Sequence, residues 1–214
     1  MEPTGFRRVL TWLFLGMVVV AAVWAMWPKR NYMEDLKEAS ALAMAGKPVS
    51  VRALLDLNPS VAKHRWPDGS TMINVAARSG FLEVVKAFHE NGAVVSAEGA
   101  GPLVAHEVLR DGAVVAHTDK VIQLLEYLQD KLGVSLEIPD RDGVKPIHLA
   151  ALMGQPTLAL WLKSRNVDVS AKDQSGLTPL DYALRAGATV AAKALAQAGF
   201  PRGAYQPPPE PAAR

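Results

Sequence analysis

Three twelve-residue segments of this chain align without gaps, and this repetition constrains the fold more than any other feature. They are GSTMINVAARSG at 69–80, GVKPIHLAALMG at 143–154 and GLTPLDYALRAG at 176–187. The last two begin 33 residues apart, and the first two begin 74 apart, which leaves room for two periods if one carries an insertion. A period near 33 is typical of a stack of repeated supersecondary units.

A segment with apolar residues at helical spacing follows each of the three. These segments are FLEVVKAFHENGA at 81–93, PTLALWLKSRNV at 156–167 and ATVAAKALAQAGF at 188–200. Each repeated unit is therefore predicted to be a pair of helices. A single pair cannot bury its apolar face, so the units must stack to form a core.

The repeated residues resemble the ankyrin family, whose unit contains G-x-T-P-L-H-x-A-A-x-x-G. The matches in the two best copies are Pro146, His148, Ala150 and Ala151, and Thr178, Pro179 and Leu180. The first copy keeps Thr71, while Met72 and Asn74 replace proline and histidine. The resemblance implies a hydrogen bond from His148 to the backbone of a neighbouring turn, and a buried position for Trp161. Asn166 stands where the family places a glycine, and asparagine tolerates the left-handed conformation expected there.

We expect about five units across residues 32–200. The first unit comprises a helix over 32–45 and a second helix with its exit loop over 46–65. The third unit, 101–139, is irregular: Pro102 and Leu103 match the motif start, but Gly112 then comes two residues late. Its second helix is predicted over 118–132, with Thr118 as N-cap. The predicted fold class is all-α, an ankyrin-type helical repeat solenoid preceded by one transmembrane helix.

A transmembrane helix is predicted over residues 9–27, which form a nineteen-residue run without a charge. A helix of this length is roughly 28 Å long, close to the ~30 Å hydrocarbon core of a bilayer. Arg7 and Arg8 belong to the leader, residues 1–8, and Lys29 and Arg30 follow the run. A cleaved secretory signal is the alternative, although its apolar stretch is usually shorter.

The positive charges before and after the run nearly balance, so the positive-inside rule barely decides the orientation and leaves both open. A short arginine pair before an apolar run resembles a signal-anchor, which favours an amino terminus in the cytoplasm. This orientation predicts a single-pass protein of the bacterial inner membrane, with the repeat domain in the periplasm. Residues 201–214 are rich in proline and are predicted to form a disordered or extended tail.

Composition and motifs point away from catalysis. The chain has no cysteine, and its net charge of +2 gives no basic field for nucleic acid. Neither His89 nor His106 has a second histidine four residues on, as a zinc protease motif requires. The segment 140–143, Asp-Arg-Asp-Gly, is interpreted as a hairpin tip rather than a calcium loop, since the later ligands are missing. We therefore predict no enzyme, cofactor, metal or small-molecule substrate.

Because the family binds protein partners on the concave face formed by hairpin tips and first helices, the resemblance implies a protein-binding site there. By motif position the predicted site comprises Trp66, Asp68, Ser70, Arg78, Arg141, Asp142, Val144, Leu152, Met153, Gln174, Ser175, Leu177 and Arg185. Several of these are apolar or aromatic where the fold does not require it, and protein interfaces favour such residues. Leu152 and Met153 in particular are expected to lie outside the core.

The predicted function is thus a non-catalytic, membrane-anchored module that binds an unidentified protein. The resemblance also suggests a sharper alternative, because ankyrin-type proteins with an export signal or anchor occur beside secreted bacterial toxins such as lipases. The protein would then be an immunity protein. An assembly factor of an envelope complex is a further alternative.

Overall fold

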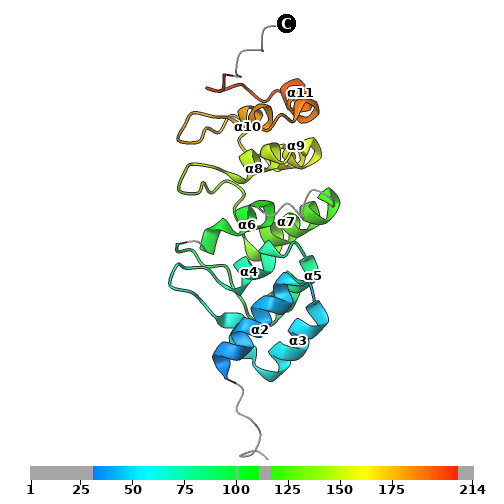
Figure 1. Ribbon diagram of the computed structural model, residues 1–214, viewed down its shortest axis with the longest axis vertical. Helices are drawn as coiled ribbons and strands as arrows, with labels where there is room; N and C mark the ends of the chain where they lie inside the picture. The colour runs from blue at the N-terminus through cyan, green and yellow to red at the C-terminus, as the bar shows by residue number, and fades with distance from the viewer. Residues whose placement is uncertain (1–30, 100, 111–116, 207–214) are drawn as a thin grey trace, which may run out of the picture.

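The computed structural model describes residues 31–99, 101–110 and 117–206, and these form one elongated stack of helix pairs (Figure 1). The first helices are α2 (Tyr32–Met44), α4 (Met72–Arg78), α6 (Val104–Arg110), α8 (Pro146–Leu152) and α10 (Pro179–Arg185). The second helices are α3 (Pro48–Leu57), α5 (Leu82–Glu90), α7 (Thr118–Leu132), α9 (Pro156–Ser164) and α11 (Thr189–Gln197). Two 3₁₀ turns, η1 (Pro59–Lys63) and η2 (Gly101–Leu103), complete the order. The prediction of an all-helical repeat fold is confirmed for these residues, where the nearest approach to a strand is one bridge between Arg65 and Thr71.

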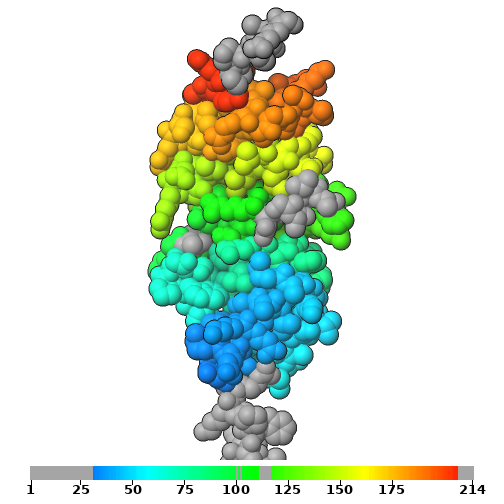
Figure 2. Space-filling model, in the orientation of Figure 1, coloured from blue at the N-terminus to red at the C-terminus, as the bar shows by residue number. Residues whose placement is uncertain are grey.

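Each first helix packs against the first helix of the next unit, and each second helix against the next second helix. The units therefore follow one another along the axis of the stack in chain order (Figure 2). Loops between units project on one side of the stack, most clearly between α7 and α8 and between α9 and α10 (Figure 1). This layout places the hairpin tips and the first helices together on one side, away from the second helices.

No helix in the described ranges is both long and apolar enough to cross a membrane. The predicted transmembrane segment, 9–27, and the leader, 1–8, lie outside the described residues.

Helix starts in the last two units follow the motif residues. Thr178 caps α10, because its side chain accepts a hydrogen bond from the Asp181 backbone N–H, and Pro179 fills the first helical position. Pro146 fills the same position in α8. Asn166 has a φ of 63°, so the predicted left-handed asparagine is confirmed.

The third unit follows a different register from the predicted one. Pro102 lies in the 3₁₀ turn η2, and α6 begins two residues later, at Val104. His106 is then the third residue of α6, as His148 is of α8. In this register Gly112 comes six residues after His106, as Gly154 comes six after His148, so the apparent two-residue delay disappears.

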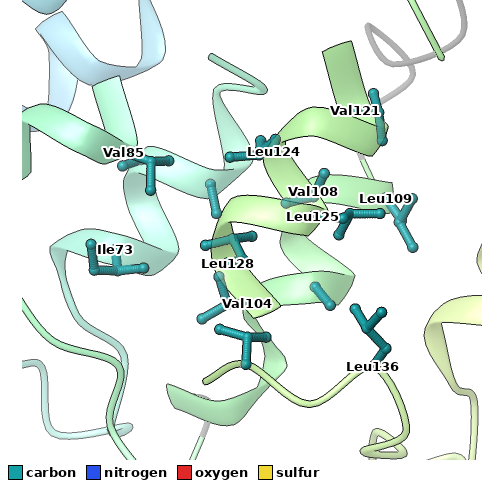
Figure 3. Close-up of a cluster of buried hydrophobic side chains, with 14 of the residues drawn as sticks. Ile73, Val85, Val104, Val108, Leu109, Val121, Leu124, Leu125, Leu128 and Leu136 are labelled. Atoms are coloured by element: carbon teal, nitrogen blue, oxygen red, sulfur yellow. The ribbon is translucent and has the colours of Figure 1, made fainter. Parts of the chain in front are cut away.

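The insertion in the third unit enlarges its second half. Residues 111–117 separate α6 from α7, where only 153–155 separate α8 from α9, and α7 has 15 residues against nine in α9. Thr118 is the first residue of α7 rather than its N-cap, and its hydroxyl bonds Gln155 Oε1 at 3.1 Å. The longer helix adds buried apolar side chains to the core of the third unit. Figure 3 shows this cluster, which includes Ile73, Val85, Val104, Val108, Leu109, Val121, Leu124, Leu125, Leu128 and Leu136.

A ladder of buried polar side chains runs through the stack, one from each first helix. Asn74 Nδ2 donates to Gly101 O at 3.4 Å, and His106 Nε2 bonds Val144 O at 2.8 Å. His148 Nε2 bonds Ala171 O at 3.1 Å, which confirms the hydrogen bond predicted for it. The other two members are Asp35, bonded to Asn58 Nδ2, and Asp181, bonded to Gly203 N. Each bond satisfies a buried polar group and ties the helix to the loop after its own unit.

Two glycines allow neighbouring hairpins to touch near the third unit. A Cβ added to Gly99 would lie 1.9 Å from Asp68 O, and one added to Gly69 would lie 2.1 Å from Glu98 O. Both glycines also have positive φ, 57° and 85°. Gly69 and Gly99 are therefore required for the close packing of these two hairpins.

The structure describes the predicted tail only as far as residue 206, and residues 207–214 lie outside the described residues. Residues 201–206 fold back on the last unit, where Thr178 Oγ1 donates to Pro201 O at 2.9 Å and Ala204 N donates to Gly176 O at 3.2 Å. This segment takes the place that a following hairpin has in the other units, so the folded region extends past residue 200.

Trp161 was expected to be a core residue, but it is only partly buried, at the edge of the core. Its Nε1 donates to Glu126 Oε1 of α7 at 3.2 Å, and the Arg165 guanidinium lies 5.9 Å from its ring. The indole N–H needs an acceptor, and a carboxylate at the core edge supplies one. Trp161 therefore links α7 to α9 across the surface of the second helices.

Candidate functional site

An aspartate organises each of the two most regular hairpins. Asp140 Oδ1 accepts from the N–H groups of Asp142 and Val144, and Asp173 Oδ1 accepts from those of Ser175 and Leu177. Burial alone would raise the pKa of Asp173, but these bonds and the Tyr182 hydroxyl, 2.8 Å from Oδ2, lower it. The turns are thus held by the chain itself, and the interpretation of 140–143 as a hairpin tip agrees with their geometry.

Val144 and Leu177, predicted as site residues, help to close these hairpins. Their backbone carbonyls accept from Asp140 N and Asp173 N, and their side chains pack partly against the core. Val144 and Leu177 therefore have mainly a structural role in the hairpins.

The tips of the same hairpins are exposed and joined to each other. Arg141, Asp142, Gln174 and Ser175 are all exposed. Gln174 Nε2 donates to Arg141 O at 2.7 Å, and Gln174 N donates to Asp142 O at 3.0 Å. The two tips form one continuous edge whose Arg141 side chain, Asp142 carboxylate and Ser175 hydroxyl face solvent.

Trp66 replaces the organising aspartate in the hairpin of the second unit. Trp66 N donates to Ser70 O, as Asp140 N donates to Val144 O. The aspartate function has moved to Asp68, whose Oδ1 accepts from Ser70 N and Oγ at 2.9 and 2.6 Å; this bonding lowers the pKa of Asp68. The Trp66 ring lies edge-on to His64, with centroids 4.6 Å apart, and stays half-exposed. The turn therefore does not depend on the Trp66 side chain.

A row of long side chains runs along the first helices at one equivalent position. In four of the five units, the residue four places after the ladder residue has a long side chain: Arg78 in α4, Arg110 in α6, Leu152 in α8 and Arg185 in α10. In α2 the same position is the buried Ala39. All four are exposed, Leu152 to 39%. We call these four residues the first-helix row.

Two arginines of this row are positioned by the next unit, and the third by a residue of its own helix. Arg78 Nε lies 2.9 Å from Glu107 Oε2, and Arg110 Nη2 lies 3.0 Å from Asp140 Oδ2. The Arg185 guanidinium lies 4.6 Å from the centre of the Tyr182 ring. Burial and the hydrogen bond to Asp173 raise the pKa of Tyr182 to about 12, so the ring stays neutral beneath the cation. Each arginine keeps part of its donor set for another molecule, since guanidinium has five N–H groups.

Sequence reasoning found Arg78, Leu152 and Arg185 but missed Arg110, because it placed the third unit in the wrong register. The six-residue spacing from His106 to Gly112 is the signal that identifies Arg110. Met153 is the predicted site residue that fits least well: it is partly buried against the core as the C-cap of α8. The expectation that both Leu152 and Met153 lie outside the core therefore holds for Leu152 only.

The buried histidines and aspartates of the described residues all belong to the ladder. Burial lowers the pKa of both His106 and His148, and each imidazole bonds a backbone carbonyl. Within the described ranges, no three histidine or acidic side chains come together as a metal site would require. The arrangement offers exposed cations, hairpin tips and apolar side chains, which is what binding a protein surface requires.

Comparison with known proteins agrees with this geometry. Residues 127–183 match the family described as ankyrin repeats (many copies). A putative palmitoyltransferase ZDHHC13 of Danio rerio is 31% identical over 122 residues, which cover 54% of this chain and 17% of the relative. The potassium channel SKOR of Arabidopsis thaliana is 37% identical over 81 residues, which cover 35% of this chain and 10% of the channel.

The matched regions span less than a fifth of either relative, so their names do not define an activity for this chain. The family match covers the end of the third unit, the whole of the fourth and most of the first helix of the fifth. This match supports an ankyrin-repeat assignment for residues 127–183, which lie within a stack of similar helix pairs and hairpins.

Proposed function

We propose that this protein is a non-catalytic, membrane-anchored module that binds another protein through its hairpin tips and first-helix row. The observation that carries the proposal is the first-helix row itself. It places three arginines and a leucine at one equivalent position on consecutive first helices, where the stack needs only solvent-compatible side chains. Such a row fits a partner that presents carboxylates around an apolar side chain.

Leu152 is the central element of this surface. Along the row it is flanked by Arg110 and Arg185. In the sequence, its helix lies between the two linked hairpins, 140–144 and 173–177. An exposed leucine with an arginine on each side along the row resembles an interface anchor, in which an apolar group is bordered by polar contacts. The membrane part of the proposal is supported by the uncharged run at 9–27. We further propose that the repeats lie on the periplasmic side of a bacterial inner membrane.

Crosslinking in native membranes followed by copurification tests the proposal. Leu152→Lys should reduce the recovered partner at least tenfold, which corresponds to loss of about 1.4 kcal/mol of binding. Leu160→Lys is the matched control, because Leu160 is 37% exposed, close to the 39% of Leu152, but belongs to the second helix α9. Equal capture by both variants would place the interface elsewhere. If capture does not depend on residues 1–28, the partner is bound by the repeats alone and the anchor has a separate role.

A further inference from the structure

The first helix pair exposes several large apolar side chains, beside exposed charged residues that include Lys37 and Asp56. Along α3, Val49, Ala53 and Leu57 are exposed and lie four residues apart, so they form one line on the side opposite the buried Val51, Leu54 and Leu55. Val49 and Leu57 expose 77% and 69% of their surface. On α2, Met33 and Met44 expose 53% and 45%, with the exposed Ala41 between them. We call these six residues the terminal face.

The terminal face lies at an end of the stack. α2 and α3 pack against α4 and α5 on their inner side (Figure 1). In the described residues no further unit precedes α2. Terminal repeats normally carry a polar outer face, because they have no neighbour to cover an apolar one. Four of the nine large hydrophobic residues that are exposed in the described residues belong to this single unit, so its apolar character is not an average property of the surface.

The sequence before α2 limits how far this face can be from the apolar run. Residues 28–31 are all that separates Trp27 from the first residue of α2, and four extended residues span at most about 14 Å. Asn31 Oδ1 accepts from Met33 N at 3.1 Å, so α2 is capped at Asn31, four residues after Trp27 in the sequence. Leu57 lies at the same end of the pair, because the next residue, Asn58, donates to Asp35 Oδ2 at 2.9 Å.

We propose that the terminal face lies flat on the lipid surface, with its apolar side chains among the headgroups and upper acyl chains. The proposal rests on the membrane anchor proposed above. Its chemistry is apolar rather than electrostatic, because residues 32–57 carry three basic and four acidic side chains. The exposed apolar residues at both ends of α2 and α3 favour a pair that lies along the membrane over one that stands on end. This arrangement projects the stack, with its hairpin tips, away from the bilayer.

The absence of cysteine from the chain allows a clean test on the full-length protein in phosphatidylcholine vesicles. An Ala53→Cys variant carrying a polarity-sensitive fluorophore should be quenched by nitroxide-labelled lipid and protected several-fold from aqueous iodide. The control is Ala196→Cys, an exposed position on α11 at the far end of the stack, whose label should show the opposite behaviour. High salt should not change either result, since charge does not hold the face in place.

A second variant separates the terminal face from the anchor. Val49→Glu with Leu57→Glu should make the label at position 53 accessible to iodide, while the protein still floats with the vesicles. Val190→Glu, at an equally exposed valine on α11, should leave that label protected.

The outcomes distinguish the possible failures. A protein that does not float overturns the anchor and this inference together. A floating protein whose two labels are equally open to iodide overturns the inference alone. The label at position 53 could also be protected from both nitroxide-labelled lipid and iodide, and lose that protection when the protein is diluted in the membrane. This result would show that a second copy of the chain covers the terminal face, and it would overturn the inference.

Discussion

Acidification should weaken the stack through two residues of the buried ladder. His148 uses both ring nitrogens in its neutral form: Nε2 donates to Ala171 O, and Nδ1 accepts from Lys145 N at 3.1 Å. A proton on Nδ1 would set two N–H groups against each other and would break the contact that begins α8. His106 has one bond, to Val144 O, and its buried Nδ1 has no hydrogen-bond partner.

The direction of the effect follows from the lowered pKa values. Burial lowers the pKa of both histidines below 6.5, so below pH 6.5 the unfolded chain binds protons that the folded chain does not. The stabilisation is complete above pH 6.5 and is lost as the pH falls toward the folded pKa. Titration of the unfolded imidazole sets the upper limit of this loss, which is about 1 kcal/mol of unfolding free energy per histidine between pH 6.5 and 5.5, or about 2 kcal/mol for the pair.

The chain supplies its own control residue, because Asn74 occupies the ladder position in the second unit and donates to a backbone carbonyl without titrating. Urea unfolding of residues 31–214, followed by circular dichroism at pH 7.5, 6.5 and 5.5, should show this loss in the wild type. His106→Asn combined with His148→Asn should remove most of the pH dependence, whatever it does to stability at pH 7.5. A wild-type protein of equal stability at pH 6.5 and 5.5 would refute the reasoning, and so would a double variant with an undiminished pH dependence.

Three further substitution tests use the same unfolding assay. Gly133 has a φ of 66° and free space where a Cβ would lie, so Gly133→Ala should cost about 1–2 kcal/mol of unfolding free energy. Gly99→Ala adds a clash with the preceding hairpin and should cost at least ~2 kcal/mol more. Equal costs would show that the hairpins can separate freely. Leu152→Lys should stay within about 0.5 kcal/mol of wild type, while Met153→Glu should cost ~1–2 kcal/mol because Met153 packs partly on the core; the reverse order would contradict the assigned burial. Trp161→Ala should cost about 2 kcal/mol, less than the ~3–5 kcal/mol of a fully buried aromatic, and a larger loss would restore it to the core.

The regular units could be predicted because their signals are local. Pro146 and Pro179 mark helix starts by their fixed φ, and Asn166 marks a left-handed helix end. Each of these residues acts within about one turn of the chain, so sequence spacing alone places it. The same local logic located α7 to the residue, although it assigned the N-cap to Thr118.

The third unit was placed in the wrong register because one local signal has two meanings. Proline favours the first position of an α-helix, but it equally suits a 3₁₀ turn, and Pro102 lies in such a turn two residues before α6. Pro102 could begin α6 or precede it in a 3₁₀ turn, and in the sequence only the spacing from His106 to Gly112 distinguishes these two registers. The spacing becomes decisive once His106 is known to bond a backbone carbonyl in the same way as His148.

The candidate site depends on contacts between units, and these explain why its residues were only partly predictable. Arg78 was correctly placed on an exposed first-helix position, but its partner Glu107 belongs to the third unit, whose register was unknown. Arg110 was hidden by the same error, although it bonds Asp140 of the following hairpin. The residues of such a row can be identified only when the register of every unit is known. The misplaced third unit therefore hid both Arg110 and Glu107, the partner of Arg78. Leu152 could be identified from its own unit because its environment there is solvent, and for that reason it is the residue on which the binding proposal should first be tested.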